Sequence, residues 1–307
     1  MRLSYGLLLA ALMPAAEPDW NKIEDEALGL LQRYIRIQSI NPPADVREAA
    51  AFFEAQLKSA GLEPKLYRSH ESGKVNLLVR IPGRDRTKKP LLLLNHFDVV
   101  PVDAKMWGMD PFSALLKDGF IWGRGALDMK GIGIQHLMTL MVMKRHGVLP
   151  SRDIVMLTTA DEETDGVYGI NWMIANHFGE IDSEFVLDEG GMGSRDVFAK
   201  GKLVYGVAVA EKQVTWLKLR ATGTAAHGSQ PIPDNANDRL LRAIAKATTF
   251  EGREKPHPLV EEMRRNIGGS LADNKYIKAI QKNTISLTTL RAGVGDPPKA
   301  NVIPSVS

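Results

Sequence analysis

The stretch Pro90-Leu91-Leu92-Leu93-Leu94-Asn95, followed directly by His96-Phe97-Asp98, decides the fold of this sequence. An uninterrupted apolar run of this length is typical of a strand that is buried on both faces, as in the centre of a parallel sheet. A second apolar run, residues 153–160, is followed directly by three acidic residues. The two runs together indicate an α/β domain in which polar side chains follow buried strands.

Helical and strand patterns alternate on both sides of these two runs. Helical periodicity covers residues 20–36, 47–60, 129–146 and 169–177, and further strands are predicted at residues 76–81 and 184–187. Helices that alternate with buried strands form a largely parallel sheet. We therefore expect a mostly parallel α/β domain over residues 17–209.

The pattern changes after about residue 206. Residues 214–222 and 283–290 alternate between apolar and polar side chains, which predicts strands with one face exposed to water. A helix is predicted at residues 237–249, and residues 301–307 are typical of the start of another strand. This pattern predicts a smaller α+β domain over residues 210–307.

Composition excludes several classes of site. The 307 residues include no cysteine, so disulfides, thiolate metal sites and cysteine nucleophiles are excluded, and any metal must be bound by His, Asp or Glu. The formal net charge is only +3, and the short basic clusters contain no interleaved aromatic residues. Neither feature favours nucleic-acid binding.

The first 16 residues resemble a secretory signal peptide. Arg2 supplies one positive charge, an apolar run of about ten residues follows, and the segment ends in small residues. This predicts export to the periplasm or the extracellular space, with an ordinary N-terminal segment of a cytoplasmic protein as the alternative. The run is too short for a membrane span, and no membrane span is predicted in the mature chain.

Acidic and histidine residues follow the ends of the predicted strands. They are His96 and Asp98, Asp128 before the long helix, Asp161-Glu162-Glu163, and Asp188-Glu189. Each position has an ordinary structural alternative: a buried hydrogen-bonded histidine, a helix N-cap, an exposed acidic turn or a turn before glycines. In an open α/β sheet, however, the carboxyl ends of the strands border the ligand crevice, and an imidazole with carboxylates favours Zn, Mn or Co.

Several motifs in this order resemble the two-zinc amidohydrolase and metallopeptidase family of aminoacylase, carboxypeptidase G, succinyl-diaminopimelate desuccinylase and acetylornithine deacetylase. The resemblance covers roughly residues 20–307. The matching segments are residues 96–101, Trp107 with 110–112, 123–131, 161–163, 188–191, 226–229 and 301–305.

The resemblance implies a two-metal centre, most simply two zinc ions, with cobalt or manganese as alternatives. His96 and Asp188 would bind one ion, Asp128 would bridge both ions, and Glu163 would bind the second.

The resemblance also implies catalytic roles. Glu162 would be the general base, and Asp98 would lie behind His96 and tune it. His227 would reach the partner subunit's site from a ferredoxin-like lid and dimerisation domain and stabilise the oxyanion, and Asn301 would contact substrate.

The sequence departs from the family pattern in two places. Thr164-Asp165-Gly166 stands where the family commonly has a glycine pair. The family's catalytic domain also resumes after the lid and supplies a further metal-binding histidine. We therefore expect a chain that is incomplete at its C-terminus, with a truncated lid, poor activity by itself and at most one tightly bound metal.

The resemblance predicts a hydrolase that uses a water activated by two metals to cleave an amide bond next to a free carboxylate. The substrate would be an N-acyl amino acid or a short peptide trimmed from its C-terminus, and the protein would be a homodimer. The alternatives are a non-catalytic scaffold or dimerisation protein, and a deacetylase or desuccinylase of a biosynthetic intermediate. The signal-like segment disfavours the last of these.

Overall fold

The computed structural model describes residues 17–190, 192–208, 212–252, 256–268 and 270–307. The predicted signal peptide lies outside these residues. Contacts divide the chain into two compact units, one before and one after the bond between Gly190 and Gly191. Each unit is described by itself below.

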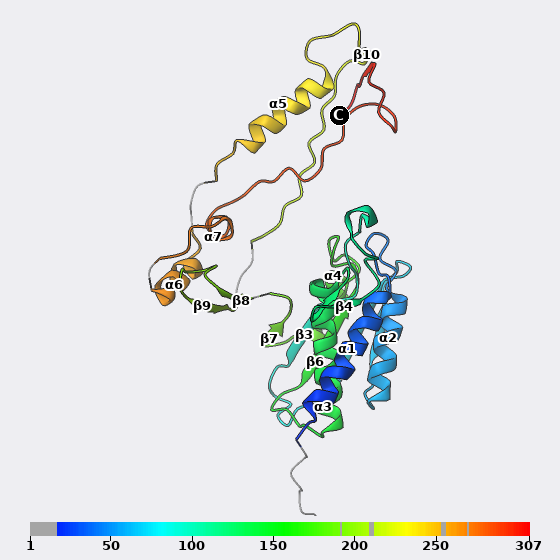
Figure 1. Cartoon of the computed structure of the whole chain (residues 1–307), viewed down its shortest axis with the longest axis vertical. Helices are drawn as coiled ribbons and strands as arrows, with labels where there is room; N and C mark the ends of the chain where they lie inside the picture. The colour runs from blue at the N-terminus through cyan, green and yellow to red at the C-terminus, as the bar shows by residue number, and fades with distance from the viewer. Residues whose placement is uncertain (1–16, 191, 209–211, 253–255, 269) are drawn as a thin grey trace, which may run out of the picture. The chain divides into compact units, whose positions relative to one another are not determined.

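The first unit is built around a five-stranded sheet with the order β1-β2-β6-β3-β7 (Figure 1). The pairings β3–β6 and β3–β7 are parallel, whereas β1–β2 and β2–β6 are antiparallel, so β2 alone runs against the other four strands. The prediction of a mostly parallel sheet is therefore confirmed. The strands are β1 (Lys65–Arg68), β2 (Val75–Ile81), β3 (Leu91–His96), β6 (Ile154–Thr159) and β7 (Phe185–Leu187).

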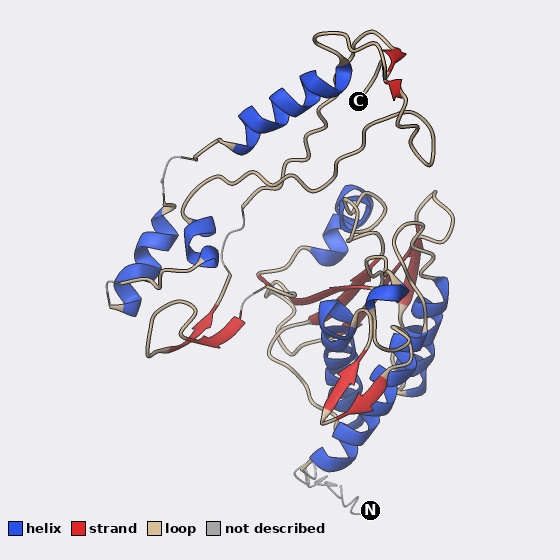
Figure 2. Cartoon of the chain, turned by 45° about the horizontal axis from the view of Figure 1, so that its top comes forward, coloured by secondary structure: helices blue, strands red, loops and turns tan. Residues whose placement is uncertain are grey.

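Helices cover both faces of this sheet (Figure 2). On one face, side chains such as Tyr34, Phe53 and Leu137 from three helices pack against the sheet. On the other face, Met173 and Ile181 of a fourth helix pack against strands β2, β3 and β6. The helices are α1 (Trp20–Arg36), α2 (Arg47–Ser59), α3 (Gly131–Arg145) and α4 (Ile170–Ile181).

The alternation of side chains along the strands explains why the runs are continuously apolar. Leu93 faces the helices α1 to α3 and its neighbour Leu92 faces α4. Since successive side chains point to opposite faces of a strand, a strand with both faces covered needs apolar residues at every position. The register pairs Leu91–His96 of β3 with Ile154–Thr159 of β6, so both strands end at the same edge of the sheet.

A π-helical turn, η2 (Ala126–Lys130), precedes α3. The predicted helix start at residue 129 is therefore wrong by two residues, because the backbone angles of Asp128 and Met129 are not helical. The side chain of Lys130 is fully buried, and its Nζ donates hydrogen bonds to the main-chain oxygens of Tyr34 (3.0 Å) and Ile37 (2.6 Å). These bonds tie the turn to the end of α1.

Two short elements complete the first unit. A 3₁₀ turn, η1 (Ala104–Met106), follows β3, and a hairpin of β4 (Leu115–Lys117) and β5 (Phe120–Trp122) precedes η2.

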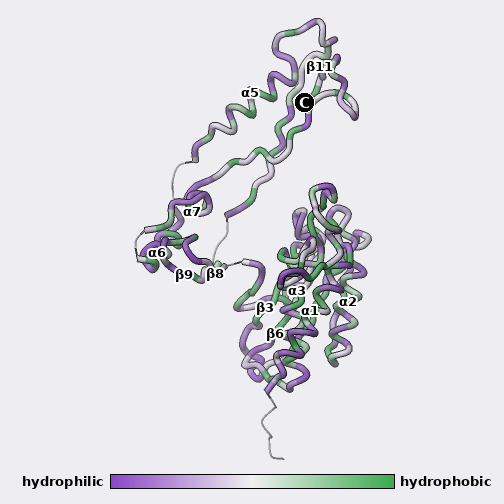
Figure 3. The backbone as a smooth tube through the Cα atoms, in the orientation of Figure 1, coloured by the Kyte–Doolittle hydropathy of each residue, from purple (hydrophilic) through white to green (hydrophobic). Residues whose placement is uncertain are grey.

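The described part of the second unit combines three helices with one short hairpin and one two-stranded ladder between segments that are distant in the sequence. Strand β8 (Met192–Arg195) pairs with β9 (Leu203–Gly206), and β10 (Ala226–His227) pairs with β11 (Val302–Ile303). Helix α5, along which hydrophobic and hydrophilic positions alternate (Figure 3), confirms the helix predicted at residues 237–249 to within one residue at each end. The helices are α5 (Ala236–Thr248), α6 (Pro258–Ile267) and α7 (Lys275–Ile280).

The strands predicted at residues 214–222 and 283–290 are wrong. Among the described residues of these segments, only Thr222 forms a β-bridge, with Val306. Trp216 is 75% exposed and Leu287 is 51% exposed. The apolar side chains of the alternating pattern are therefore not covered by other elements in the described part of this unit. The ferredoxin-like arrangement of this domain stays a prediction.

Within the described part of the chain, the structure has no helix that combines the length and the apolar composition needed to cross a bilayer.

Candidate active site

His96 lies at the C-terminal end of β3 and is 2% exposed. Its Nδ1 atom donates a hydrogen bond to the main-chain oxygen of Asp98 (2.9 Å). Because a carbonyl oxygen only accepts, this bond places the proton of a neutral imidazole on Nδ1 and leaves the lone pair on Nε2. Such a histidine is oriented as a metal ligand.

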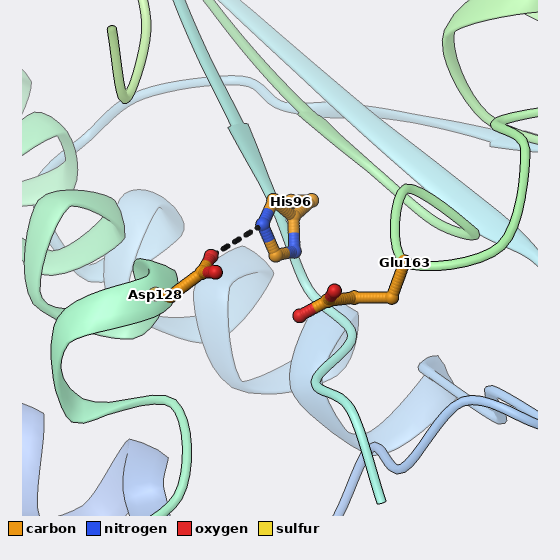
Figure 4. A group of neighbouring side chains, drawn as sticks. All are labelled: His96, Asp128 and Glu163. Carbon is orange, nitrogen blue, oxygen red and sulfur yellow. Dashed lines mark hydrogen bonds and ion pairs between the residues drawn. The ribbon is translucent and has the colours of Figure 1, made fainter. Parts of the chain in front are cut away.

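Carboxylates from three loops gather around Nε2 of His96. The distances from Nε2 are 3.2 Å to Oδ1 of Asp128, 3.7 Å to Oε2 of Glu162 and 3.6 Å to Oε2 of Glu189. Asp128 belongs to η2, Glu162 follows β6, and Glu189 follows β7. Glu163, the neighbour of Glu162, approaches the imidazole from the side opposite to Asp128 (Figure 4).

The crowding of negative charge shifts the pKa values of this cluster. Burial acts to lower the pKa of His96, but the hydrogen bond to Asp128 and the surrounding carboxylates outweigh it and raise the pKa to about 10. Burial, followed by the charge of Asp128, raises the pKa of Glu163 to about 7. Burial is also the main cause of the raised pKa of Glu162. A divalent cation relieves such a concentration of carboxylates.

The donor atoms fit a divalent metal. His96, Asp128 and Glu163 form one group, and His96, Glu162 and Glu189 form another; in each group one ligand atom per residue lies within 4.8 Å of the others. One imidazole with carboxylate oxygens suits Zn, Mn or Co. Since Nε2 of His96 carries a single lone pair, His96 could bind only one ion, and a second ion would depend on the carboxylates.

Four of the predicted site residues come together at this edge: His96, Asp128, Glu162 and Glu163. The sequence reasoning missed Glu189, although it is part of the motif that contains Asp188. The structure turns Glu189 toward His96, whereas Oδ1 of Asp188 accepts a hydrogen bond from the main-chain N of Gly190 (2.7 Å). The two residues are adjacent, and only the direction of each side chain distinguishes them.

Asp98 lies next to His96, with Oδ1 3.7 Å from Nδ1, and its predicted role in tuning His96 stays a prediction. Its carboxylate also accepts hydrogen bonds from the main-chain N–H groups of Glu162 (3.2 Å) and Glu163 (3.1 Å). Asp98 therefore joins the end of β3 to the acidic loop after β6, a contact that the sequence pattern did not indicate.

The two predicted site residues of the second unit lie next to each other. His227 is paired with Val302 across β10 and β11, and the main-chain N of Gly228 donates to the main-chain oxygen of Asn301 (2.8 Å). The exposed imidazole of His227 forms a hydrogen bond through Nδ1 with Oγ of Ser229 (2.8 Å). The functions of His227 and Asn301 stay predictions.

The sequence profile of peptidase family M20/M25/M40 matches residues 92–270. The chain belongs to this family. The matched segment contains the histidine and all the carboxylates gathered around it, so the geometry and the family agree on the position of the site. It also contains His227, whereas Asn301 lies beyond it.

Curated relatives of this M20/M25/M40 member include aminoacylase-1 of Pongo abelii, which is 32% identical over 92% of the chain. Human aminoacylase-1 is 31% identical over the same share. The chain spans 64% of the length of these two relatives. A probable carboxypeptidase S-like 1 of Dictyostelium discoideum is 31% identical over 76% of the chain and 49% of its own length.

Solved structures share the fold of this family member. The M20 family metallo-carboxypeptidase Sso-CP2 of Sulfolobus solfataricus superposes with a TM-score of 0.63 at 20% identity, covering 92% of this chain and 69% of that one. Human carnosine dipeptidase 1 gives a TM-score of 0.61 at 16% identity, covering 94% and 70%.

The pKa values of the cluster predict that zinc affinity rises with pH. Between pH 6 and pH 8 the metal-free protein carries an imidazolium at His96, and below about pH 7 it carries a protonated Glu163. Zinc must displace these protons, so each displaced proton changes the affinity by about tenfold per pH unit. Competition with a chelating dye between pH 6 and pH 9 measures this slope. An affinity that is constant over this range contradicts the prediction.

Proposed function

We propose that the protein is a metal-dependent hydrolase of amide bonds next to a free carboxylate. Its substrates would be N-acyl amino acids or short peptides cleaved at the C-terminal residue. The observation that carries the proposal is the cluster at the edge of β3 and β6, where a buried imidazole faces carboxylates that fit a divalent ion. The sequence similarity to aminoacylase-1 and to a probable carboxypeptidase S-like 1 supports the substrate class.

We propose that His96, Asp128 and Glu189 hold one ion, and that Asp128 and Glu163 hold a second. Asp128 would serve both ions, because its two oxygens can each face one ion, whereas Nε2 of His96 can serve only one. The distances from Nε2 to Asp128 and to Glu189 support the first set, and the grouping of Asp128 with Glu163 supports the second.

Divalent ions bound there would lower the pKa of a water molecule and polarise the substrate carbonyl. Glu162 is the proposed general base. It lies close to Nε2 of His96 without belonging to the ligand sets proposed here, and its raised pKa suits a group that accepts a proton and then donates it to the leaving amine. Asp98 holds the main chain of Glu162 in place.

A panel of substrates tests the proposed function. The full chain, purified with and without added zinc, is assayed on N-acetyl amino acids, N-fatty-acyl amino acids, dipeptides and N-succinyl-diaminopimelate. Zinc-dependent cleavage of the first three classes supports the proposal. Preference for the last indicates a desuccinylase, and a folded protein that binds no divalent metal indicates a non-catalytic scaffold.

The choice between Asp188 and Glu189 as a ligand is tested by a matched pair of variants. We expect Glu189→Gln to lower zinc affinity by more than the roughly tenfold that loss of a supporting partner costs, because its carboxylate faces His96. Asp188→Asn retains the oxygen that accepts from Gly190 and is expected to bind zinc nearly as well as the wild type. Titration with a chelating dye compares the zinc affinities of the two variants. A larger loss of zinc affinity in Asp188→Asn than in Glu189→Gln would make Asp188 the ligand.

We propose further that the protein is a homodimer in which His227 acts on the partner's site and stabilises the oxyanion, with Asn301 contacting substrate. His227→Ala should then bind zinc normally and lose about 10²-fold in kcat. Mixing it with Glu162→Ala should restore activity, since one site of each heterodimer has both residues. Confirmed heterodimers without restored activity would refute action across the dimer.

A further inference from the structure

A buried network of polar side chains lies under the loop that carries Glu162 and Glu163. The carboxylate of Asp161, the first of the three adjacent acids, accepts hydrogen bonds from Nζ of Lys74 (2.9 Å) and Oγ1 of Thr164 (2.8 Å). The side chains of Lys74 and Asp161 are each only 6% exposed. Lys74 therefore holds Asp161 in a buried ion pair.

Asn41 connects this ion pair to Asp98. Its Nδ2 atom donates to Oδ2 of Asp98 (2.7 Å) and lies 3.1 Å from Oγ1 of Thr164 and 3.4 Å from Oδ1 of Asp161. Asn41 is itself 2% exposed. One amide thus lies between two buried carboxylates and donates between them, where two negative charges would otherwise face each other directly.

The loop between these carboxylates has a backbone conformation that its surroundings must maintain. Asp161 has φ 68°, in the left-handed region that residues with side chains rarely adopt. Such conformations persist where neighbouring contacts determine them. Here the carboxylates of Asp161 and Asp98 provide those contacts on the two sides of the loop.

We propose that Lys74 and Asn41 are positioning residues of the site. Lys74 keeps Asp161 turned away from the carboxylates around His96. Of the three adjacent acids, only Glu162 and Glu163 then face His96. Asn41 holds Asp161 and Asp98 at the spacing that fixes the main chain of Glu162 and Glu163. The catalytic part of this inference rests on the proposed function, whereas the positioning part concerns the loop itself.

The test compares Lys74→Met and Asn41→Leu with Arg80→Met in the full chain. Arg80 is the matched control. It lies in β2, the strand that begins directly after Lys74, and it forms a partly buried ion pair with Asp153 (2.8 Å). Lys74 precedes the start of β2, whereas Arg80 lies near the end of that strand. Arg80 pairs with Val155 near the start of β6, and the acidic loop follows the other end of β6. Arg80→Met therefore removes an ion pair without touching that loop.

Three measurements are made on each variant. We expect amide hydrogen exchange in residues 161–166 to accelerate at least about tenfold in Lys74→Met and Asn41→Leu, relative to Arg80→Met at matched global stability. Zinc affinity is expected to fall about 10- to 100-fold. On the substrate that the wild type cleaves, kcat is expected to fall about 10- to 100-fold, with KM changed less than about threefold.

Exchange and zinc affinity equal to those of Arg80→Met overturn the inference. If the wild type cleaves no amide, the proposed function fails, while the exchange data still decide whether Lys74 and Asn41 position the loop. If Lys74→Met does not fold, Lys74→Met/Asp161→Asn removes both charges and retains an accepting oxygen. Wild-type exchange and kcat in that folded double variant would likewise overturn the inference.

Discussion

Glu162→Gln is expected to retain bound metal and lose about 10²- to 10⁴-fold in kcat, the usual contribution of a general base. The substitution keeps the size of the side chain and the main-chain N–H that Asp98 accepts, so the loop should stay in place. The amide cannot take a proton from water at neutral pH. Steady-state kinetics and elemental analysis of the same sample check both parts of this expectation.

A suitable control is Glu54→Gln, which removes a carboxylate from the exposed i,i+4 pair with Lys58 on α2 and should leave kcat unchanged. Glu163→Gln provides the contrast, because loss of a proposed ligand should reduce the bound metal. A kcat of Glu162→Gln close to that of the wild type would show that another group accepts the proton.

The second large effect is expected for His96→Ala. Both groups of candidate ligands include His96, which supplies the imidazole nitrogen of each. Without it the remaining donors are carboxylates that repel one another. We expect zinc affinity to fall and kcat/KM to fall at least about 10³-fold, equivalent to about 4 kcal/mol of transition-state stabilisation.

His146→Ala is the control for His96→Ala. His146 is the C-cap of α3, at the opposite end of that helix from Asp128, and its replacement should leave zinc content and activity at wild-type values. Folding of His96→Ala is checked by circular dichroism. Zinc bound by folded His96→Ala as tightly as by the wild type would contradict the ligand assignment.

The centre of the first unit was predictable because strands β3 and β6 are largely buried between helices. Where helices cover both sides, successive positions of a strand must be apolar, and the run Leu91–Leu94 of β3 shows this directly before the polar Asn95 and His96 end the strand. Helix α1 was predicted with its observed bounds because its periodicity is clear and Asp19 caps its start. The start of α3 was not predicted, because the non-helical backbone of Asp128 depends on contacts with the distant end of α1 through Lys130.

The site was predictable to the level of strand ends. Placement after β3 and β6 identified His96 and the acidic loop, but the direction of adjacent side chains distinguished Glu189 from Asp188 only in three dimensions. The network of Asn41 and Lys74 was missed because these residues join the site through contacts between distant segments. In the second unit, residues 214–222 alternate between apolar and polar side chains, but a strand also needs a neighbouring strand to pair with. The sequence pattern does not show whether such a neighbour is present.

The position of His96 and its carboxylate neighbours on separate segments affects how the chain folds. The donors end β3, follow β6 and β7 or lie in η2, so they come together only after the parallel pairing of β3 with β6 and β7. Contacts between such distant segments form late and slowly. An unfolded chain therefore offers zinc only scattered single ligands, and an ion that binds the assembled edge stabilises the native state by mass action. Metal supply during synthesis should consequently affect the yield of folded protein as well as its activity.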